Sequence, residues 1–291
     1  MRLDDERESS NFEVQSGRGG FGGGLGGGLG MLLPFIGSRF GCGGIVIALI
    51  ILVVMGVNPL SLVGGGGGVQ QEQSVSRDPQ KLSDIQHWSL NVLGSMERVW
   101  GQIFQEAGQQ YQPTVLSFYS QAGASGCGAA QSAMGPFYCP NDKKVYLDTD
   151  FFTELRQRFG APGDFAQAYV IAHEVGHHIQ DLEGTLGQVQ QRQRSVGEEA
   201  GNALQVRVEL QADCYAGVWA KRTGLMEAGD LEEGMTAAQS IGDDTLQKAA
   251  GRRPVPESFT HGSSEQRMTW LRKGLDSGDP AQCDTFAAGS R

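Results

Sequence analysis

The sequence predicts a mainly helical α+β protein with a short strand and hairpin region, preceded by one transmembrane helix. Apolar residues recur at helical spacing through residues 82–107 and again from residue 164 onward, which is typical of helices that pack on a core. Short apolar runs between residues 114 and 148 are separated by turn residues, which indicates strands. With 291 residues, the chain has room for one main domain and accessory segments.

The first 80 residues are expected to lie outside the main domain. Residues 1–40 are predicted to be a cytoplasmic, glycine-rich, disordered tail, because the run 17–30 has no periodic apolar face. The uncharged stretch 41–63 is long enough for a transmembrane helix. A cleaved signal peptide is the alternative, but the preceding region is long and shows no clear small-residue cleavage site. Residues 64–80 begin with five glycines and are expected to be a flexible linker to a domain at 81–291.

Charges on either side of the apolar stretch predict its orientation. Arg2, Arg7, Arg18 and Arg39 precede it, whereas the first basic residue after it is Arg77. The positive-inside rule then places the N-terminus in the cytoplasm. The chain is therefore expected in the bacterial inner membrane as a single-pass protein, with the lipid bilayer as a partner and its main domain in the periplasm or outside the cell.

Cysteine content agrees with export. Cys42 is expected to be a buried thiol in the span, and the domain holds four more, at positions 127, 139, 214 and 283. An even number in an oxidising compartment favours disulfides. Of the three possible connectivities, Cys127–Cys139 with Cys214–Cys283 is preferred. Metal ligation by cysteine is the alternative, but the chain has no C-x-x-C pair.

The first part of the domain is predicted to be a helix followed by strands. Residues 82–107 carry apolar side chains at helical spacing, as an ordinary core-facing stripe. Strands are expected at residues 114–119, 136–139 and 144–148, and the Pro-Asn-Asp sequence at 140–142 is expected to be the turn of a hairpin.

A helix with metal-binding character follows a Pro-Gly break at residues 162–163. Asp164 is its expected N-cap, and apolar residues lead to the sequence His-Glu-Val-Gly-His at 173–177. Residues four apart share one helix face, so His173 and His177 can both reach one Zn²⁺ ion. Such a site lowers the pKa of a bound water to about 7, and Glu174 is placed to take its proton.

A second helix, expected from residue 198 to about 221 and ending near Gly224, supplies the third predicted ligand. Glu209 and Asp213 are four apart and so share a face. Two carboxylates among apolar neighbours are costly to bury unless they meet cations. Glu209 is therefore predicted to bind zinc, and Asp213 to accept the free N–H of His173 or His177. A surface helix with solvated acids is the alternative.

These motifs resemble a known family. The sequences HEVGHHIQ and ELQADCYAGVWA, with the membrane-proximal segment and THGSSEQR, are similar to a bacterial family of neutral zinc metallopeptidases of the gluzincin type, over nearly the whole chain. The resemblance implies a thermolysin-like minimal zincin core with zinc ligands His173, His177 and Glu209 and catalytic Glu174. It also implies that a strand before the zinc helix binds extended peptide, either the strand at Tyr138 or the one at Tyr146.

The later segment at 260–267 is similar to a T-H-P-x-x-x-x-R segment near the active site of membrane-associated gluzincins. By that resemblance His261 could donate a hydrogen bond to a tetrahedral oxyanion, and Arg267 could order Asp213 or the loop. The alternative is that His261 caps a helix or faces solvent. His178 and His87 are not expected to bind metal, and Gly-Asp-Asp at 242–244 is interpreted as a helix start.

Three function classes remain open on the sequence alone. The preferred one is a membrane-anchored zinc metallopeptidase with a peptide or protein substrate. The others are a zinc hydrolase of the cell-wall amidase type and a zinc-binding module without catalysis. The net charge of −10 and the lack of a basic patch exclude nucleic acid as an expected partner.

Overall fold

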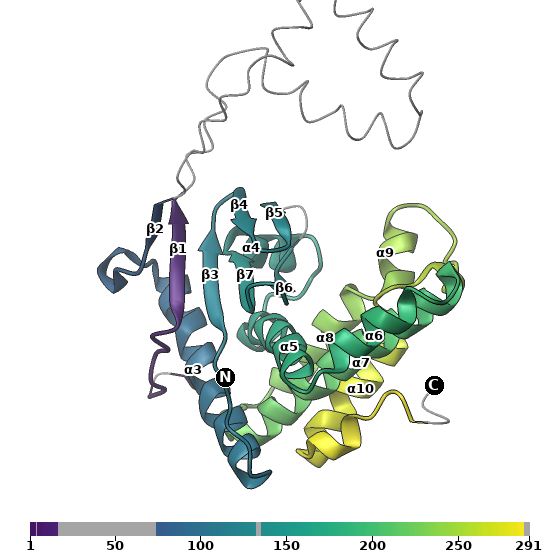
Figure 1. Ribbon diagram of the computed structural model, residues 1–291. Coiled ribbons are helices and arrows are strands. Elements are labelled where there is room, and N and C mark those ends of the chain that lie inside the picture. Colours follow the sequence, from purple (N-terminus) through teal and green to yellow (C-terminus); the bar gives the residue numbers. More distant parts are fainter. Residues whose placement is uncertain (4, 17–73, 132–134, 288–291) are drawn as a thin grey trace, which may run out of the picture. The chain divides into compact units, whose positions relative to one another are not determined.

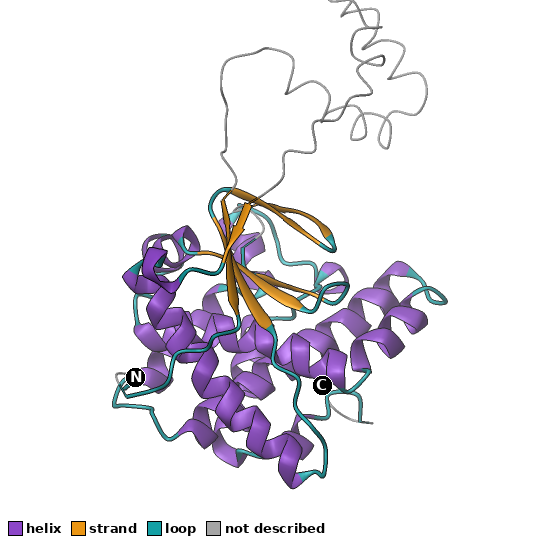
Figure 2. Ribbon diagram, turned by 60° about the vertical axis from the view of Figure 1, so that its left-hand side comes forward, coloured by secondary structure: helices purple, strands orange, loops and turns teal. Residues whose placement is uncertain are grey.

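The computed structural model describes residues 1–3, 5–16, 74–131 and 135–287. The predicted mainly helical α+β class is confirmed, with a small sheet beside a larger group of helices (Figures 1 and 2). The longer helices are, in chain order, α3 (Asp84–Glu106), α4 (Asp150–Gln157), α5 (Asp164–Leu182), α6 (Thr185–Gln193), α7 (Glu198–Thr223), α8 (Asp230–Ser240), α9 (Asp243–Ala249) and α10 (Ser264–Ser277). Short 3-10 helices lie at Pro79–Lys81, Pro256–Ser258 and Pro280–Cys283.

The main sheet has the strand order β2-β1-β3-β7-β6. Its strands are β1 (Phe12–Ser16), β2 (Ser74–Ser76), β3 (Val115–Tyr119), β6 (Phe137–Cys139) and β7 (Lys144–Asp148), and β4 (Ala122–Ser125) and β5 (Gly128–Gln131) form a separate hairpin. β3 runs parallel to both of its neighbours, whereas β6 is antiparallel to β7. β7 is therefore an interior strand and β6 is an edge strand, and this settles which of the two predicted candidates lies at the edge.

The N-terminus corrects the expected domain division. β1 pairs in parallel with β3 through Phe12↔Leu116 and is flanked on its other side by β2. Residues 1–17 and 74–291 form one compact unit. The prediction of a disordered tail is therefore wrong for Phe12–Ser16, which form a strand of the sheet, and for Met1 and Leu3, which are buried in the core. The predicted tail from residue 17, the span and most of the linker lie outside the described residues.

The strand pairing also bears on membrane topology. Ser16 and Ser74 are partners in the antiparallel β1–β2 pair, so the chain leaves and re-enters the domain at one place. A single crossing by residues 41–63 would put two paired strands on opposite sides of a bilayer, which is incompatible with that pair. No helix in the part of the chain that the structure describes is long and apolar enough to cross a membrane.

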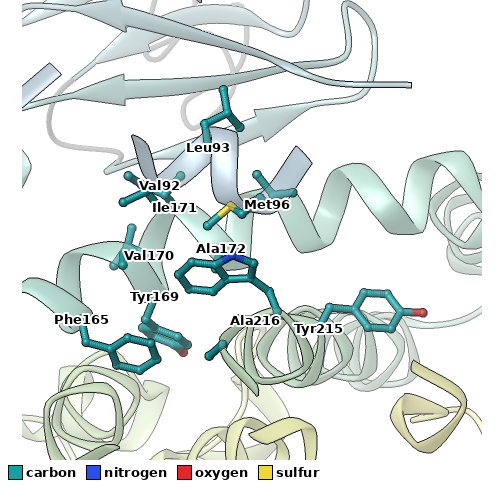
Figure 3. Close-up of a cluster of buried hydrophobic side chains, with 14 of the residues drawn as sticks. Val92, Leu93, Met96, Phe165, Tyr169, Val170, Ile171, Ala172, Tyr215 and Ala216 are labelled. Carbon is teal, nitrogen blue, oxygen red and sulfur yellow. The ribbon is translucent and has the colours of Figure 1, made fainter. Parts of the chain in front are cut away.

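The core is built around α5, which lies between α3, α7 and α8. Figure 3 shows Val92, Leu93 and Met96 of α3 and Ala216 of α7 close to the apolar residues of α5. Because α5 is covered on most sides, its polar residues are also buried, His173 among them at 7% exposure. Asp164 is the first residue of α5, and the N-cap is Gly163 rather than Asp164.

A glycine lets α5 and α7 approach closely. A Cβ atom on Gly176 would lie 3.0 Å from the Cα and carbonyl oxygen of Ala212, so a larger residue would require the α7 backbone to shift by a few tenths of an ångström. The residue directly before the second histidine of the HExxH motif is thus a glycine because α7 crosses α5 at this point. This close crossing brings the polar face of α7 against the two histidines of α5.

Two disulfide bonds cross-link the domain, one among the strands and one near the C-terminus. Cys127 pairs with Cys139 and Cys214 with Cys283, so the preferred connectivity is confirmed. The first links the β4–β5 hairpin to the end of β6. The second links α7 to the 3-10 helix near the C-terminus, where the Gln211 amide also donates to the Cys283 carbonyl at 3.0 Å.

Candidate zinc centre

The centre combines two histidines of α5 with one glutamate of α7. His173 Nε2 lies 3.1 Å and His177 Nε2 lies 3.5 Å from the same oxygen of Glu209, Oε2. One donor atom from each of the three residues lies within 4.8 Å of the other two. A tetrahedral zinc site with metal–ligand distances of about 2.0–2.2 Å separates its ligand atoms by about 3.3–3.6 Å. Two imidazoles and one carboxylate at these separations fit a zinc ion.

Both histidines are oriented by oxygen atoms on their other ring nitrogen. His173 Nδ1 donates to Asp213 Oδ1 at 2.8 Å, and His177 Nδ1 donates to Gln180 Oε1 at 2.8 Å. The Gln180 amide cannot turn over, because its nitrogen donates to the Val208 carbonyl at 2.7 Å. Each ring therefore directs Nε2 toward the centre, which is the arrangement seen around protein-bound zinc.

Asp213 is held in turn by two residues behind the centre. Arg267 Nε and Nη2 donate to its two oxygens at 2.9 and 2.8 Å, and the Tyr169 hydroxyl donates to Oδ1 at 2.6 Å. Asp213 is 0% and Arg267 is 2% exposed. A buried carboxylate with a bidentate guanidinium partner is fixed in position, so Asp213 cannot swing into the centre to become a fourth ligand.

The charges around the centre favour a cation between its residues. Burial alone would lower the pKa of His173, but Asp213 and Glu209 outweigh it and raise the pKa to about 10 in the metal-free chain. Burial would likewise raise the pKa of Glu209, but His177 and His173 hold it well below its usual value. The negative charge that stabilises protonated histidines here would equally stabilise a divalent cation.

Glu174 lies beside the donor set without belonging to it. Its carboxyl is buried, and burial raises its pKa above the usual value, although the two histidines act in the opposite direction. The backbone N–H of Tyr138, in the edge strand β6, faces this carboxyl and also acts to lower its pKa. A carboxylate with a pKa nearer neutrality is suited to accept a proton at pH 7.

His261 reaches the same cleft from the loop before α10. Its backbone N–H and that of Thr260 each donate to Asp243 Oδ2 at 2.7 Å, and its Nδ1 lies 3.3 Å from Asp243 Oδ1. The hydrogen bond to Asp243 raises the pKa of His261. The side chain is 52% exposed, so it partly faces solvent, as the alternative expected, whereas the N-cap of α10 is Ser263 and not His261.

A cleft of about 560 Å³ opens in front of these residues. Its lining includes His173, Glu174, His177 and Glu209, together with Phe137 and Tyr138 of β6 and the preceding Pro136. Further lining residues are mostly apolar side chains and glutamines, with one acidic and one basic residue: Phe151, Phe159, Val170, Leu186, Val189, Gln190, Gln193, Gln205, Glu154 and Arg158. His261 and Arg267 also lie at its wall, so all the predicted ligand and catalytic residues meet in one cleft.

Three residues of the site were not predicted from the sequence. Gln180 lies three positions after His177 on the same helix, Tyr169 lies four before His173, and Asp243 was interpreted only as a helix start. Helical spacing from a ligand histidine could have suggested the first two. Asp243 had no local signal, because its partners Thr260 and His261 lie 17 and 18 residues further along the chain.

Two histidines one turn apart on a buried helix, with a glutamate from a facing helix, define the HExxH zinc proteins whose third ligand is a glutamate. Comparison with known families agrees. The model of the family described as "Putative neutral zinc metallopeptidase" matches residues 1–286, and the chain belongs to that family. Zinc is accordingly its cofactor, with His173, His177 and Glu209 as the residues that would hold it.

Relatives of the chain occur in distant bacteria. It is 46% identical over 291 residues to "Uncharacterized protein YpfJ" of Escherichia coli (strain K12), covering 98% of this chain and 99% of the relative. It is also 46% identical over 191 residues to "Uncharacterized protein Rv2575" of Mycobacterium tuberculosis (strain ATCC 25618 / H37Rv), covering 61% of this chain and 63% of that protein. No solved structure matches the chain significantly.

Proposed function

We propose that this protein is a zinc-dependent metallopeptidase that hydrolyses peptide bonds, on a thermolysin-like minimal zincin core. The observation that carries the proposal is the placement of Glu174. Its buried carboxylate adjoins a His/His/Glu donor set on the floor of a cleft that has a strand along one side. Proton transfer by a carboxylate next to a metal site, within reach of extended peptide, is the arrangement that peptide hydrolysis requires.

The residues of the chain take distinct roles in this proposal. Zinc, when bound, polarises the scissile carbonyl and acidifies the attacking water. Glu174 accepts a proton from that water and passes it to the leaving amine. His261 donates a hydrogen bond to the developing oxyanion, for which the pKa raised by Asp243 is favourable because it increases the protonated fraction of the imidazole. Asp213 and Arg267 act through His173, whose ring they orient.

The edge strand supports a peptide as substrate. Within the described residues, β6 pairs only with β7, so its outer edge is available to an added strand. The apolar residues of α4 and α5 beside the centre suit uncharged side chains near the scissile bond. A cell-wall amidase and a zinc-binding module without catalysis remain the alternatives, because either could use the same three zinc ligands.

The experiment compares wild-type protein with Glu174→Gln after zinc loading. Both are incubated with a mixture of quenched fluorescent peptides and, in parallel, with muropeptides from digested cell wall, and products are identified by mass spectrometry. We expect peptide cleavage by the wild type and loss of nearly all of it in Glu174→Gln at unchanged zinc content, because an amide cannot accept the proton. Cleavage of muropeptides alone would favour the amidase. Zinc binding without cleavage of either substrate would favour the non-catalytic module.

Membrane attachment is part of the proposal and rests on sequence. The uncharged stretch 41–63 supports association with a bilayer, and two disulfides support an oxidising compartment such as the periplasm. The pairing of β1 with β2 revises the predicted orientation, so that residues 1–16 and the zinc domain are both expected on the outer side of the inner membrane.

A further inference from the structure

Tyr138 connects the edge strand to the zinc helix through its hydroxyl. The oxygen lies 2.9 Å from Asp181 Oδ2 and 3.1 Å from His178 Nδ1, both on α5. Asp181 also lies 3.9 Å from the ammonium of Lys143, in the turn that joins β6 to β7. The C-terminal half of α5 therefore holds the β6–β7 hairpin at two points.

His178, the histidine directly after the HExxH motif, has an oxygen atom within hydrogen-bond distance of each ring nitrogen. It is 1% exposed, and its Nε2 lies 2.6 Å from the carbonyl oxygen of Gln112. A carbonyl oxygen can only accept, so Nε2 carries a hydrogen and Nδ1 faces Tyr138. The ring also packs against the rings of Tyr111 and Tyr138, with centroids 6.0 and 5.5 Å away. His178 thus has no freedom to turn toward the metal site. Its two ring nitrogens face Gln112, in the segment before β3, and Tyr138, in β6.

The backbone of Tyr138 meets the zinc centre at the same time. Its N–H faces the Glu174 carboxylate. In an antiparallel pair, the N–H and C=O of one residue point to the same side of the strand. The carbonyl of Tyr138 therefore also faces away from β7, along the edge of β6 that borders the cleft.

We propose that His178, together with Asp181, is a positioning residue that acts through Tyr138: the pair holds the edge strand at the place where its backbone meets Glu174 and can bind extended substrate. The proposal rests on the proposed peptidase function and names how that function obtains its substrate-binding strand. It also gives a role to the second of the two adjacent histidines, which a zinc site alone does not explain. Neither His178 nor Asp181 touches substrate or metal in this scheme.

A neighbouring tyrosine, Tyr111, provides a control that distinguishes an anchoring role of His178 from a role in core packing. The Tyr111 ring also packs on His178, but its buried hydroxyl has no hydrogen-bond partner among the described residues. If His178 served only to fill the core, the hydroxyls of Tyr111 and Tyr138 would be equally dispensable. If His178 is an anchor, only the Tyr138 hydroxyl matters.

The test therefore compares Tyr138→Phe with Tyr111→Phe, each of which removes one oxygen from a buried ring. Full-length, zinc-loaded proteins are measured by amide hydrogen exchange at residues 137–139 and by steady-state cleavage of the best quenched peptide found for the wild type. A lost hydrogen bond of ordinary strength corresponds to about a five- to tenfold change. We expect Tyr138→Phe to speed exchange in β6 and to raise KM by about that factor, with zinc content unchanged and a smaller change in kcat. Tyr111→Phe should match the wild type in all of these.

His178→Gln and Asp181→Asn extend the comparison and should reproduce the Tyr138→Phe effects if they fold. Equal exchange rates in Tyr138→Phe and Tyr111→Phe would overturn the anchor. Faster exchange with unchanged KM would overturn the role in substrate positioning. If the wild type cleaves no peptide, the proposed peptidase function fails by that result alone, and the exchange comparison still decides whether Tyr138 is anchored.

Discussion

Arg267 of α10 holds both carboxylate oxygens of Asp213 of α7, at 2.9 and 2.8 Å, with both side chains almost wholly buried. Burial would raise the pKa of Asp213, but Arg267 and His173 outweigh it and lower the pKa to about 2. Asp213 therefore stays charged at neutral pH and keeps accepting the Nδ1–H of His173. Through this one pair, a helix near the C-terminus determines the orientation of a zinc ligand on α5.

The first prediction concerns this pair. Arg267→Lys keeps the charge but replaces two parallel N–H donors by one ammonium, so Asp213 loses its fixed position. We expect zinc affinity to fall by about 10- to 100-fold, the usual effect of losing a partner behind a ligand histidine. Zinc titration of the metal-free proteins measures this. Arg272→Lys, on the exposed side of the same helix, is the matched control, and equal affinities in the two variants would contradict the role given to Arg267.

The zinc residues could be predicted because their information is local. His173 and His177, and likewise Glu209 and Asp213, are each one helical turn apart, and helical spacing places such residues on one face. The residues that complete the site could not be predicted from such local spacing. Asp243 binds a loop whose residues lie 17 and 18 positions further along the chain. Gln180 shares a helix with His177, but spacing alone does not show that its amide faces the histidine ring. Residues whose partners are distant in sequence can be assigned only from the three-dimensional arrangement.

The sheet shows more clearly that contacts between distant parts of the chain could not be predicted from the sequence. Strands 114–119 and 144–148 were predicted from composition, but their parallel pairing was not, and β1 was missed altogether. β1 alternates apolar and polar residues over only Phe12 to Gln15, a short signal within a polar and charged segment, and its polar residues Glu13 and Gln15 are buried. Glu13 is compensated by Lys144 at 2.7 Å, and Gln15 by Ser117 at 3.0 Å. Only the fold supplies these partners, so the sequence of β1 by itself resembles a polar tail.

The second prediction concerns His261. Asp243→Asn removes the negative charge that raises the pKa of His261, and weakens the bonds from the loop backbone. If protonated His261 stabilises the oxyanion, activity is lost as pH rises through the pKa of His261. We therefore expect the alkaline limb of the kcat profile to move to lower pH in Asp243→Asn, with zinc content unchanged. An unshifted alkaline limb, measured from pH 5 to 9 with one peptide substrate, would remove His261 from the mechanism.

The third prediction concerns the contact of Met1 with the start of α5. The Met1 ammonium lies 2.8 Å from Asp164 and 3.2 Å from Asp230. Burial would lower its pKa, but hydrogen bonds to Asp164, Glu227 and Asp230 raise it from 8.0 to about 10. A raised pKa in the folded state means that this stabilisation is complete below pH 8 and is lost as pH rises through about 10.

Asp230→Asn should therefore destabilise the protein at pH 7 by about 1–3 kcal/mol, the range for a hydrogen bond to a charged group. The difference from the wild type should shrink above pH 10. Thermal unfolding of both proteins from pH 7 to 11 measures this. Asp244→Asn, at an acidic residue of the first turn of α9 far from Met1 in sequence, should show no such change in difference above pH 10. A constant difference for Asp230→Asn across that range would show that the ammonium is not its partner.

The last prediction concerns the sidedness of the chain. β1 and β2 pair through Ser16 and Ser74, so both strands must be on one side of any bilayer that residues 41–63 enter. Arg2→Cys and Arg252→Cys place single thiols at exposed positions of the N-terminal segment and of the zinc domain, in a background in which Cys42→Ser removes the unpaired thiol. Labelling of intact spheroplasts with a membrane-impermeant maleimide should modify both positions to the same extent, because a folded sheet cannot be divided by a membrane. Labelling of position 252 without position 2 would instead restore a single crossing and require β1 to leave the sheet, in which case Val14 and Phe12 would lose their pairing with β3.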